Sequence, residues 1–206
     1  MILSGLALAL PGAVTPARPA RAQGGGPIPL SEVSRYFNAM TTAEAGFTQI
    51  NPDGTISTGR LMIWRPGRMR FEYDPPEAGL VIAGAGQVAI FDPRSNSGPT
   101  QYPLRRTPLN LILGPRIDLG QDRMVVAHRM EDTATVVVAQ DPDYPEHGTI
   151  RLLLTGGPTE LRQWRVTDDM GRETTVILDG LRTDVQFPSI KFSIAHEIDA
   201  QAERRR

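Results

Sequence analysis

The amino-acid sequence predicts a mainly β protein: a single-domain incomplete antiparallel β-barrel of about 10–11 strands with a lid of short α-helices. After residue 43, apolar residues recur mostly at every second position, which is typical of strands with one buried face. Short turns rich in glycine, proline, asparagine and aspartate separate these runs, and such turns make consecutive strands antiparallel. Two short segments instead repeat their apolar residues at helical spacing. The chain of 206 residues has the size of one domain.

The first 22 residues are expected to be an export signal peptide. The apolar run from Ile2 to Leu10 is too short to span a bilayer, and small residues at Ala20 and Ala22 form a cleavage site. No basic residue precedes this run, which is atypical of such signals. Residues 23–29 then form a flexible Gly/Pro linker, and residues 30–206 form the barrel domain. Cleavage removes two of the 22 basic residues and none of the 23 acidic ones, so the mature net charge of −3 gives no electrostatic footprint for nucleic acid.

A first helix is expected to begin at Leu30, with Ser31 as its N-cap. Its apolar residues Val33, Phe37 and Met40 follow at spacings of three and four. Because this spacing places them on one face, the helix can pack against the barrel.

A second, shorter helix is expected from Thr107 onward. Thr107 would be its N-cap and Pro108 its first residue, and the pair Gly114-Pro115 would end it. Its apolar face consists of Leu109, Ile112 and Leu113. Such a short apolar helix is unstable alone, so we expect it to lie on an apolar surface.

Eleven segments carry the strand pattern. They are residues 46–51, 56–65, 68–74, 80–83, 87–92, 123–130, 134–140, 149–155, 161–167, 174–179 and 182–187. If the second and third pair as a hairpin, they gather large apolar side chains on one face, namely Leu61, Ile63, Met69, Phe71 and Tyr73. This face is either an ordinary barrel core or an adaptable apolar binding surface.

Arg65 ends that apolar face. A buried guanidinium needs hydrogen-bond acceptors. The free carbonyl groups at the C-terminus of a covering helix are the nearest acceptors that the predicted fold offers.

No catalytic, metal or cofactor site is predicted. The chain has no cysteine, which excludes disulfides, thiolate metal sites and a lipidated cysteine anchor. His128, His147 and His196 lie in separate segments without ligand spacing. The stretch "DPDYPEH" at 141–147 could resemble a metal loop, but it lacks the glycine and glutamate spacing of a calcium loop and is better explained as a solvated turn.

The chain resembles the LolA-type periplasmic lipoprotein carriers. The resemblance rests on "GFTQ", "GRLMIWRPGRMRFEY" and "TPLNLIL" in this order and extends over residues 30–181. It implies a lidded barrel that binds the acyl chains of lipoproteins. It also implies that Arg65 is a latch that binds backbone carbonyls of the lid, in which Phe37, Ile112 and Leu113 make contacts. The acyl chains would face Leu61, Ile63, Met69, Phe71, Tyr73 and Leu109.

The resemblance implies a soluble periplasmic monomer that is neither an enzyme nor a nucleic-acid binder. It would take lipoproteins from an inner-membrane release ABC transporter and pass them to an outer-membrane receptor. That receptor shares the fold but is itself a lipoprotein, and the lack of cysteine argues against this identity here. An envelope sensor domain of the same fold, binding a protein partner, stays the alternative. The tail after Phe187 lacks the Pro-Gly that often closes the last strand in this family, so its contacts with the sheet are left open.

Overall fold

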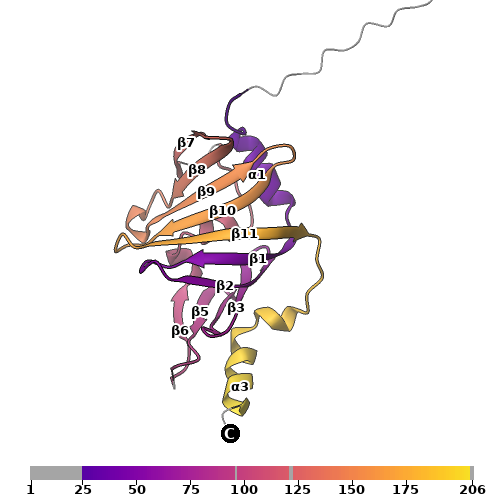
Figure 1. Ribbon diagram of the computed structural model, residues 1–206, viewed down its shortest axis with the longest axis vertical. Helices are drawn as coiled ribbons and strands as arrows, with labels where there is room; N and C mark the ends of the chain where they lie inside the picture. Colours follow the sequence, from indigo (N-terminus) through magenta and orange to yellow (C-terminus); the bar gives the residue numbers. More distant parts are fainter. Residues whose placement is uncertain (1–24, 96, 121–122, 205–206) are drawn as a thin grey trace, which may run out of the picture.

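A computed structural model describes residues 25–95, 97–120 and 123–204, which form one antiparallel sheet of eleven strands (Figure 1). The strand order is β6-β5-β4-β3-β2-β1-β11-β10-β9-β8-β7. The strands are β1 (Thr42–Ile50), β2 (Ile56–Trp64), β3 (Arg68–Tyr73), β4 (Leu80–Gly84), β5 (Gln87–Phe91), β6 (Thr100–Pro103), β7 (Val125–Glu131), β8 (Ala134–Gln140), β9 (Thr149–Thr155), β10 (Glu160–Thr167) and β11 (Glu173–Thr183). The predicted fold class, a mainly β open barrel with short helices, is confirmed.

The pairing of β1 with β11 joins two meanders into one sheet. From this seam, β1 to β6 run to one edge and β11 to β7 run to the other. The chain must therefore cross from edge to edge between β6 and β7, and the crossing segment carries η1 (Leu104–Arg106) and α2 (Asn110–Leu113). Together with α1 (Leu30–Ala39), this crossing connection, residues 104–119, is called the lid below.

The main core lies between the lid and the concave face of the sheet. In β9, alternation buries one face of the strand: Ile150, Leu152 and Leu154 are each no more than 1% exposed. The same cluster contains Val33 of α1 and Ile117 of the crossing connection. The lid is therefore closed in this structure, and its apolar side chains complete the core. Within the described residues no helix is long and apolar enough to cross a membrane.

A second, smaller apolar cluster lies on the opposite, convex face. It consists of Leu80, Ile82, Ala89 and Phe91 of β4 and β5. Two isoleucines of α3 (Ile194–Arg204) pack on it, and η3 (Ser189–Phe192) precedes this helix. The remaining short helix is η2 (Pro145–His147), between β8 and β9. The tail therefore packs on the outside of the sheet, which answers the question that the sequence left open.

Both expected helix caps are wrong. α1 begins one residue before Ser31, follows Pro29 and has no side-chain cap. The Thr107 hydroxyl donates to the carbonyl of Leu104, so it caps no helix, and α2 is a single turn that starts at Asn110. In each case the proline sets the local backbone and the hydroxyl takes no part in the helix start.

Three strand expectations are also corrected. β1 begins at Thr42, four residues earlier than predicted, and β6 was not predicted at all. β11 runs unbroken to Thr183, where two strands at 174–179 and 182–187 were expected. Gly180 adopts a positive φ of 61° beside a register shift in the β1–β11 pairing, so it forms a bulge inside a strand where a turn was expected.

Candidate functional site

The β2–β3 hairpin places the predicted apolar face on the concave side of the sheet. Its register pairs Leu61 with Phe71 and Ile63 with Met69, and all four side chains are at most 6% exposed. Tyr73 lies half-buried at the far end of the same face and packs against the core. The structure therefore brings the five residues together in one continuous stripe beneath the lid.

An aromatic cluster continues this stripe into β1 and β10. The ring of Phe47 lies 5.2 Å from that of Phe71 and 5.1 Å from that of Tyr73, both edge to face, and Trp164 lies 6.2 Å from Phe71. Gly59 faces Phe47 across the β1–β2 pair, and a Cβ there would come within 2.8 Å of the Phe47 ring. Phe47 and Trp164 were not among the site residues predicted from the sequence, although Phe47 stands in the motif "GFTQ".

Tyr73 also begins a short polar chain at this end of the concave face. Its hydroxyl donates to the Gln49 side chain at 2.8 Å, and Gln49 donates to Asn51 at 2.6 Å. Burial raises the pKa of Tyr73 to about 12. The apolar stripe thus ends in neutral polar groups on one side and in a cation on the other.

That cation is Arg65, directly after β2. Its side chain is 7% exposed, and Nη2 donates to the carbonyl of Gly114 at 2.7 Å. Beside it the amide of Gly67 donates to the carbonyl of Leu113 at 2.8 Å. Among the described residues Arg65 Nε has no hydrogen-bond partner, and burial lowers the pKa of the guanidinium. The β2–β3 turn therefore holds the end of α2 through two carbonyls that the helix leaves free.

The three predicted lid contacts lie where the lid meets the sheet. Phe37, Ile112 and Leu113 are each at most 4% exposed and belong to the same core cluster as Leu61 and Met69. Leu109 packs against this cluster and is half-buried. The lid and the concave face are thus in direct apolar contact.

The two parts of the lid are also bonded to each other, which the sequence analysis missed. Asn38 of α1 donates to the Ile117 carbonyl at 2.7 Å and accepts from the Ile117 amide at 3.0 Å. The Ser34 hydroxyl accepts from the amide of Leu119 at 2.9 Å. The sequence signal that could have indicated these bonds is the presence of polar residues beside the apolar positions of α1. These bonds couple the crossing connection to α1.

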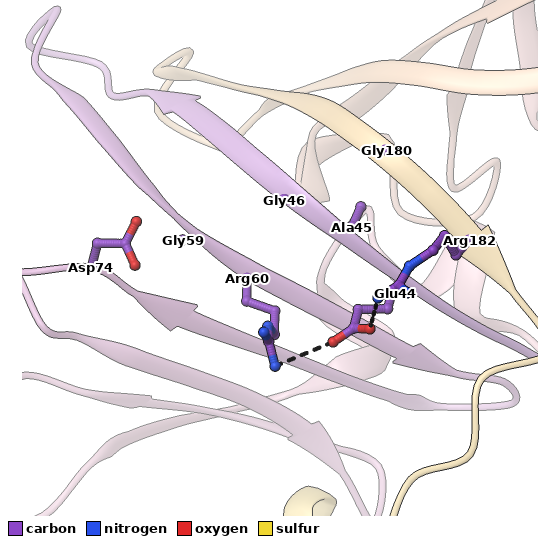
Figure 2. A pocket seen from close by; sticks show the side chains of 8 residues that line it. All are labelled: Glu44, Ala45, Gly46, Gly59, Arg60, Asp74, Gly180 and Arg182. Atoms are coloured by element: carbon purple, nitrogen blue, oxygen red, sulfur yellow. Dashed lines mark hydrogen bonds and ion pairs between the residues drawn. The ribbon is translucent and has the colours of Figure 1, made fainter.

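The convex face carries a hollow of a different chemistry (Figure 2). It measures about 320 Å³ and lies over β1, β2 and β11. Glu44 pairs with Arg60 at 3.4 Å and with Arg182 at 2.7 Å, and Asp74 lies apart at the other end. Its lining is polar and ion-paired, so an apolar ligand fits the concave face better.

The histidines lie apart, as their separate segments implied. His128 Nε2 donates a hydrogen bond to the Ile28 carbonyl at 2.9 Å, and His147 stacks on Tyr144 at the β8–β9 connection. In that connection Asp141 accepts from the amide of Asp143, which is an ordinary turn contact. Within the described ranges no group of three or more His, Cys, Asp or Glu side chains could hold a metal ion.

Comparisons with known proteins point to one family. The family described as "Outer membrane lipoprotein carrier protein LolA" matches residues 38–195. An outer-membrane lipoprotein carrier protein of Coxiella burnetii is 32% identical over 114 residues, which cover 51% of this chain and 54% of that protein. This chain thus spans about half the length of that relative. A protein of the same name from Chromohalobacter salexigens is 23% identical over 182 residues, which cover 84% of each chain.

A solved structure of a LolA superfamily protein from Nitrosomonas europaea has a TM-score of 0.43 and 7% identity, and the match covers 81% of this chain and 98% of that one. The family match alone extends over more than half of the 206 residues and includes the β2–β3 hairpin, Arg65 and α2. The chain therefore belongs to the LolA family of outer-membrane lipoprotein carrier proteins.

Proposed function

We propose that this protein is a periplasmic carrier that binds the acyl chains of lipoproteins on its concave face, beneath the lid. The observation that carries the proposal is the apolar stripe from Leu61 to Tyr73, covered by a lid that a buried guanidinium contacts at one end. In the loaded state the lid side chains would move aside and acyl chains would take their place. The named functions of the relatives support this assignment.

The energetics explain why such a carrier needs a lid. Each buried CH₂ contributes roughly 0.8 kcal/mol, so one acyl chain of about 16 carbons could gain on the order of 12 kcal/mol. Fully realised, this gain would trap the cargo. A lid that packs onto the empty concave face competes with the acyl chains and lowers their net affinity. Release then needs no external energy source.

The route of the cargo is part of the proposal. Residues 1–22 would direct export, and residues 23–29 would link the signal to the carrier domain. The protein would act as a monomer, receive lipoproteins from an inner-membrane release ABC transporter and deliver them to an outer-membrane receptor. The carrier has no catalytic role in this scheme.

Native mass spectrometry of the mature protein with a triacylated lipoprotein and with its unacylated counterpart tests the acyl-chain assignment. A one-to-one complex with the acylated form alone is the expected result. Equal binding of both forms would contradict the proposal and favour a protein-binding sensor domain.

The role of Arg65 is tested by transfer. Arg65→Leu is expected to load lipoprotein and to fail in passing it to membranes that carry the receptor, because the lid no longer competes with the cargo. Arg60→Leu is the matched control, since Arg60 lies 63% exposed on the convex face. Normal transfer by Arg65→Leu would refute the latch assignment and leave acyl binding itself intact.

A further inference from the structure

The β2–β3 turn is contacted from both faces of the sheet. On the concave side, Arg65 and the Gly67 amide bind the Gly114 and Leu113 carbonyls of the lid. The neighbouring side chains, Trp64 and Arg68, project to the other face because successive residues of a strand alternate. We call residues 64–68 the latch turn. Anything that holds its outer side also affects the orientation of Arg65.

The C-terminal segment holds that outer side. The ring of Phe192 meets the Trp64 ring edge to face at 5.8 Å between centroids. The Arg68 guanidinium lies over the Trp64 ring, 3.8 Å from its centroid. Phe192 is only 4% exposed and also touches Phe187 at 5.9 Å. Figure 1 shows the yellow C-terminal segment leaving β11 and passing the end of the barrel where β2 and β3 lie.

A second set of contacts fixes this segment to β3. Arg70 donates to the carbonyl of Lys191 at 2.9 Å and pairs with Glu197 at 3.3 Å, and both charged side chains are only 12% exposed. Ile194 and Ile198 pack on the small apolar cluster of β4 and β5. The segment is therefore seated by charge and by apolar contact together.

Gly84 allows the close approach of this segment. A Cβ on Gly84 would overlap the backbone carbonyl oxygen of Phe192. Its φ lies outside the left-handed region, so an alanine there is strained by this contact alone. The substitution Gly84→Ala thus pushes on the tail, whereas the Ile82 side chain lies at an ordinary contact distance of 4.0 Å.

We propose that the C-terminal segment, residues 187–198, is the outer support of the latch turn, and that Trp64 and Phe192 are positioning residues for Arg65. The inference rests on the proposed function of Arg65 as a latch. The guanidinium has one hydrogen bond to the lid and an unpartnered Nε among the described residues, so its closed position is weakly determined from inside. The contacts on the outer side of the latch turn supply the remaining constraint on the position of the guanidinium. Detaching the segment frees the turn and lowers the population of the closed lid.

The test uses the full mature chain labelled with 5-fluorotryptophan. The chain has two tryptophans, Trp64 under the tail and Trp164 in the core, so fluorine NMR reads both sites separately, and Trp64→Phe assigns the signals. Gly84→Ala and Phe192→Ala should each shift the Trp64 signal. Both should speed amide exchange at Gly67 and tighten binding of the apolar dye bis-ANS roughly two- to tenfold, the factor expected from losing one aromatic contact.

Gly156→Ala is the matched control, because a Cβ there meets no atom within 4 Å. A Trp64 signal that shifts while Gly67 exchange and dye affinity stay unchanged would overturn the coupling. An unshifted Trp64 signal in both variants would also overturn the coupling. The same holds for faster amide exchange that is uniform and includes the β8–β9 pair of Val137 and Leu152. Neither dye binding nor exchange involves lipoprotein, so failure of the carrier function would be seen separately, in the wild-type binding assay.

Discussion

The guanidinium of Arg65 is buried, and it has more hydrogen-bond donors than there are acceptors around it. A guanidinium carries five N–H groups, and the described residues give its buried side chain one carbonyl at 2.7 Å and no partner for Nε. Removing a charge from water offsets much of what its contacts gain. A small contribution of Arg65 to stability would favour a role in the control of the lid.

Arg65→Leu should therefore lose lipoprotein transfer while the empty protein keeps its stability. The free energy of unfolding of the empty protein should stay within about 1 kcal/mol of the wild type, because the lost hydrogen bond is offset by the avoided desolvation. Urea unfolding followed by circular dichroism measures this difference. A loss above roughly 3 kcal/mol would show that the guanidinium is mainly structural.

Because the pKa of Tyr73 is raised, the protein should lose stability at alkaline pH. Its folded pKa of about 12 lies above the ordinary value of 10.0, so its contribution is complete below pH 10 and disappears as the pH rises toward 12. The loss should reach roughly 2–3 kcal/mol, from about 1.4 kcal/mol per pKa unit. Urea unfolding between pH 9 and about 12 measures it.

Tyr73→Phe is the control for this titration. It loses the hydrogen bond to Gln49 and should be less stable near neutral pH, yet its stability should fall less between pH 10 and 12. The remaining slope would include Tyr36, whose pKa burial also raises. Parallel curves for the two proteins would contradict the assignment.

Gly59 and Gly46 form a matched pair on neighbouring strands. A Cβ at Gly59 would approach the Phe47 ring to 2.8 Å and overlap the carbonyl of Glu72, whereas a Cβ at Gly46 comes no closer than 3.6 Å to the Asp179 carbonyl. Gly59→Ala should therefore destabilise the protein by about 1–3 kcal/mol through overpacking. Gly46→Ala should stay within about 0.5 kcal/mol, and equal thermal shifts of the two variants would be the contrary result.

At the scale of elements, polar contacts hold the crossing connection of the lid at the latch turn and at α1. In α1, Asn38 bonds both backbone groups of Ile117, and Ser34 accepts from the amide of Leu119. Ile117 is 3% exposed, so its amide and carbonyl have little water to replace a lost partner. The position of the connection at Ile117 therefore depends on the side chain of Asn38.

Asn38→Ala should consequently loosen the lid. Loss of these hydrogen bonds, worth about 1 kcal/mol net, should raise the affinity of bis-ANS for the empty protein roughly fivefold. Fluorescence titration gives this affinity. Arg35→Ala on the exposed side of α1 is the control, and similar affinities for both variants would show that Asn38 has no part in lid closure.

The elements differ in how far the sequence predicts them. Alternation and turn chemistry are local, so β2, β3, β8 and β9 were predicted nearly to the residue. β6 is a four-residue edge strand ending at Pro103 and carries too little pattern of its own. Gly180 resembles a turn locally, and only the pairing with β1 makes it a bulge inside β11. These errors come from long-range pairing, which local patterns do not contain.

The same limit applies to the site across the whole molecule. Pairing of two adjacent strands predicted the stripe from Leu61 to Tyr73 and the position of Arg65. Trp164 and Asn38 reach the site from elements far away in the sequence, and local patterns do not show which residues they contact. The tail on the convex face was equally hidden, because an apolar outer face at Leu80 and Ile82 breaks the one-sided pattern.

Lid closure and acyl burial can be separated by a series of fatty acids from about 10 to about 16 carbons. Each added CH₂ should increase the binding free energy by up to about 0.8 kcal/mol wherever it is buried on the concave face. In Arg65→Leu the line of free energy against chain length should keep its slope and move toward tighter binding. The constant offset then equals the part of the lid-closing free energy that Arg65 supplies, because affinity scales with the open fraction.

Competition with bis-ANS, below the critical micelle concentration of each fatty acid, measures the two lines. Arg60→Leu should reproduce the wild-type line, because Arg60 lies on the convex face. If Arg65 touched the ligand itself, its loss would change the slope or weaken binding, since the cation would then contribute to the bound state. Equal slopes with a favourable offset are therefore the result that only competition between lid and acyl chain produces.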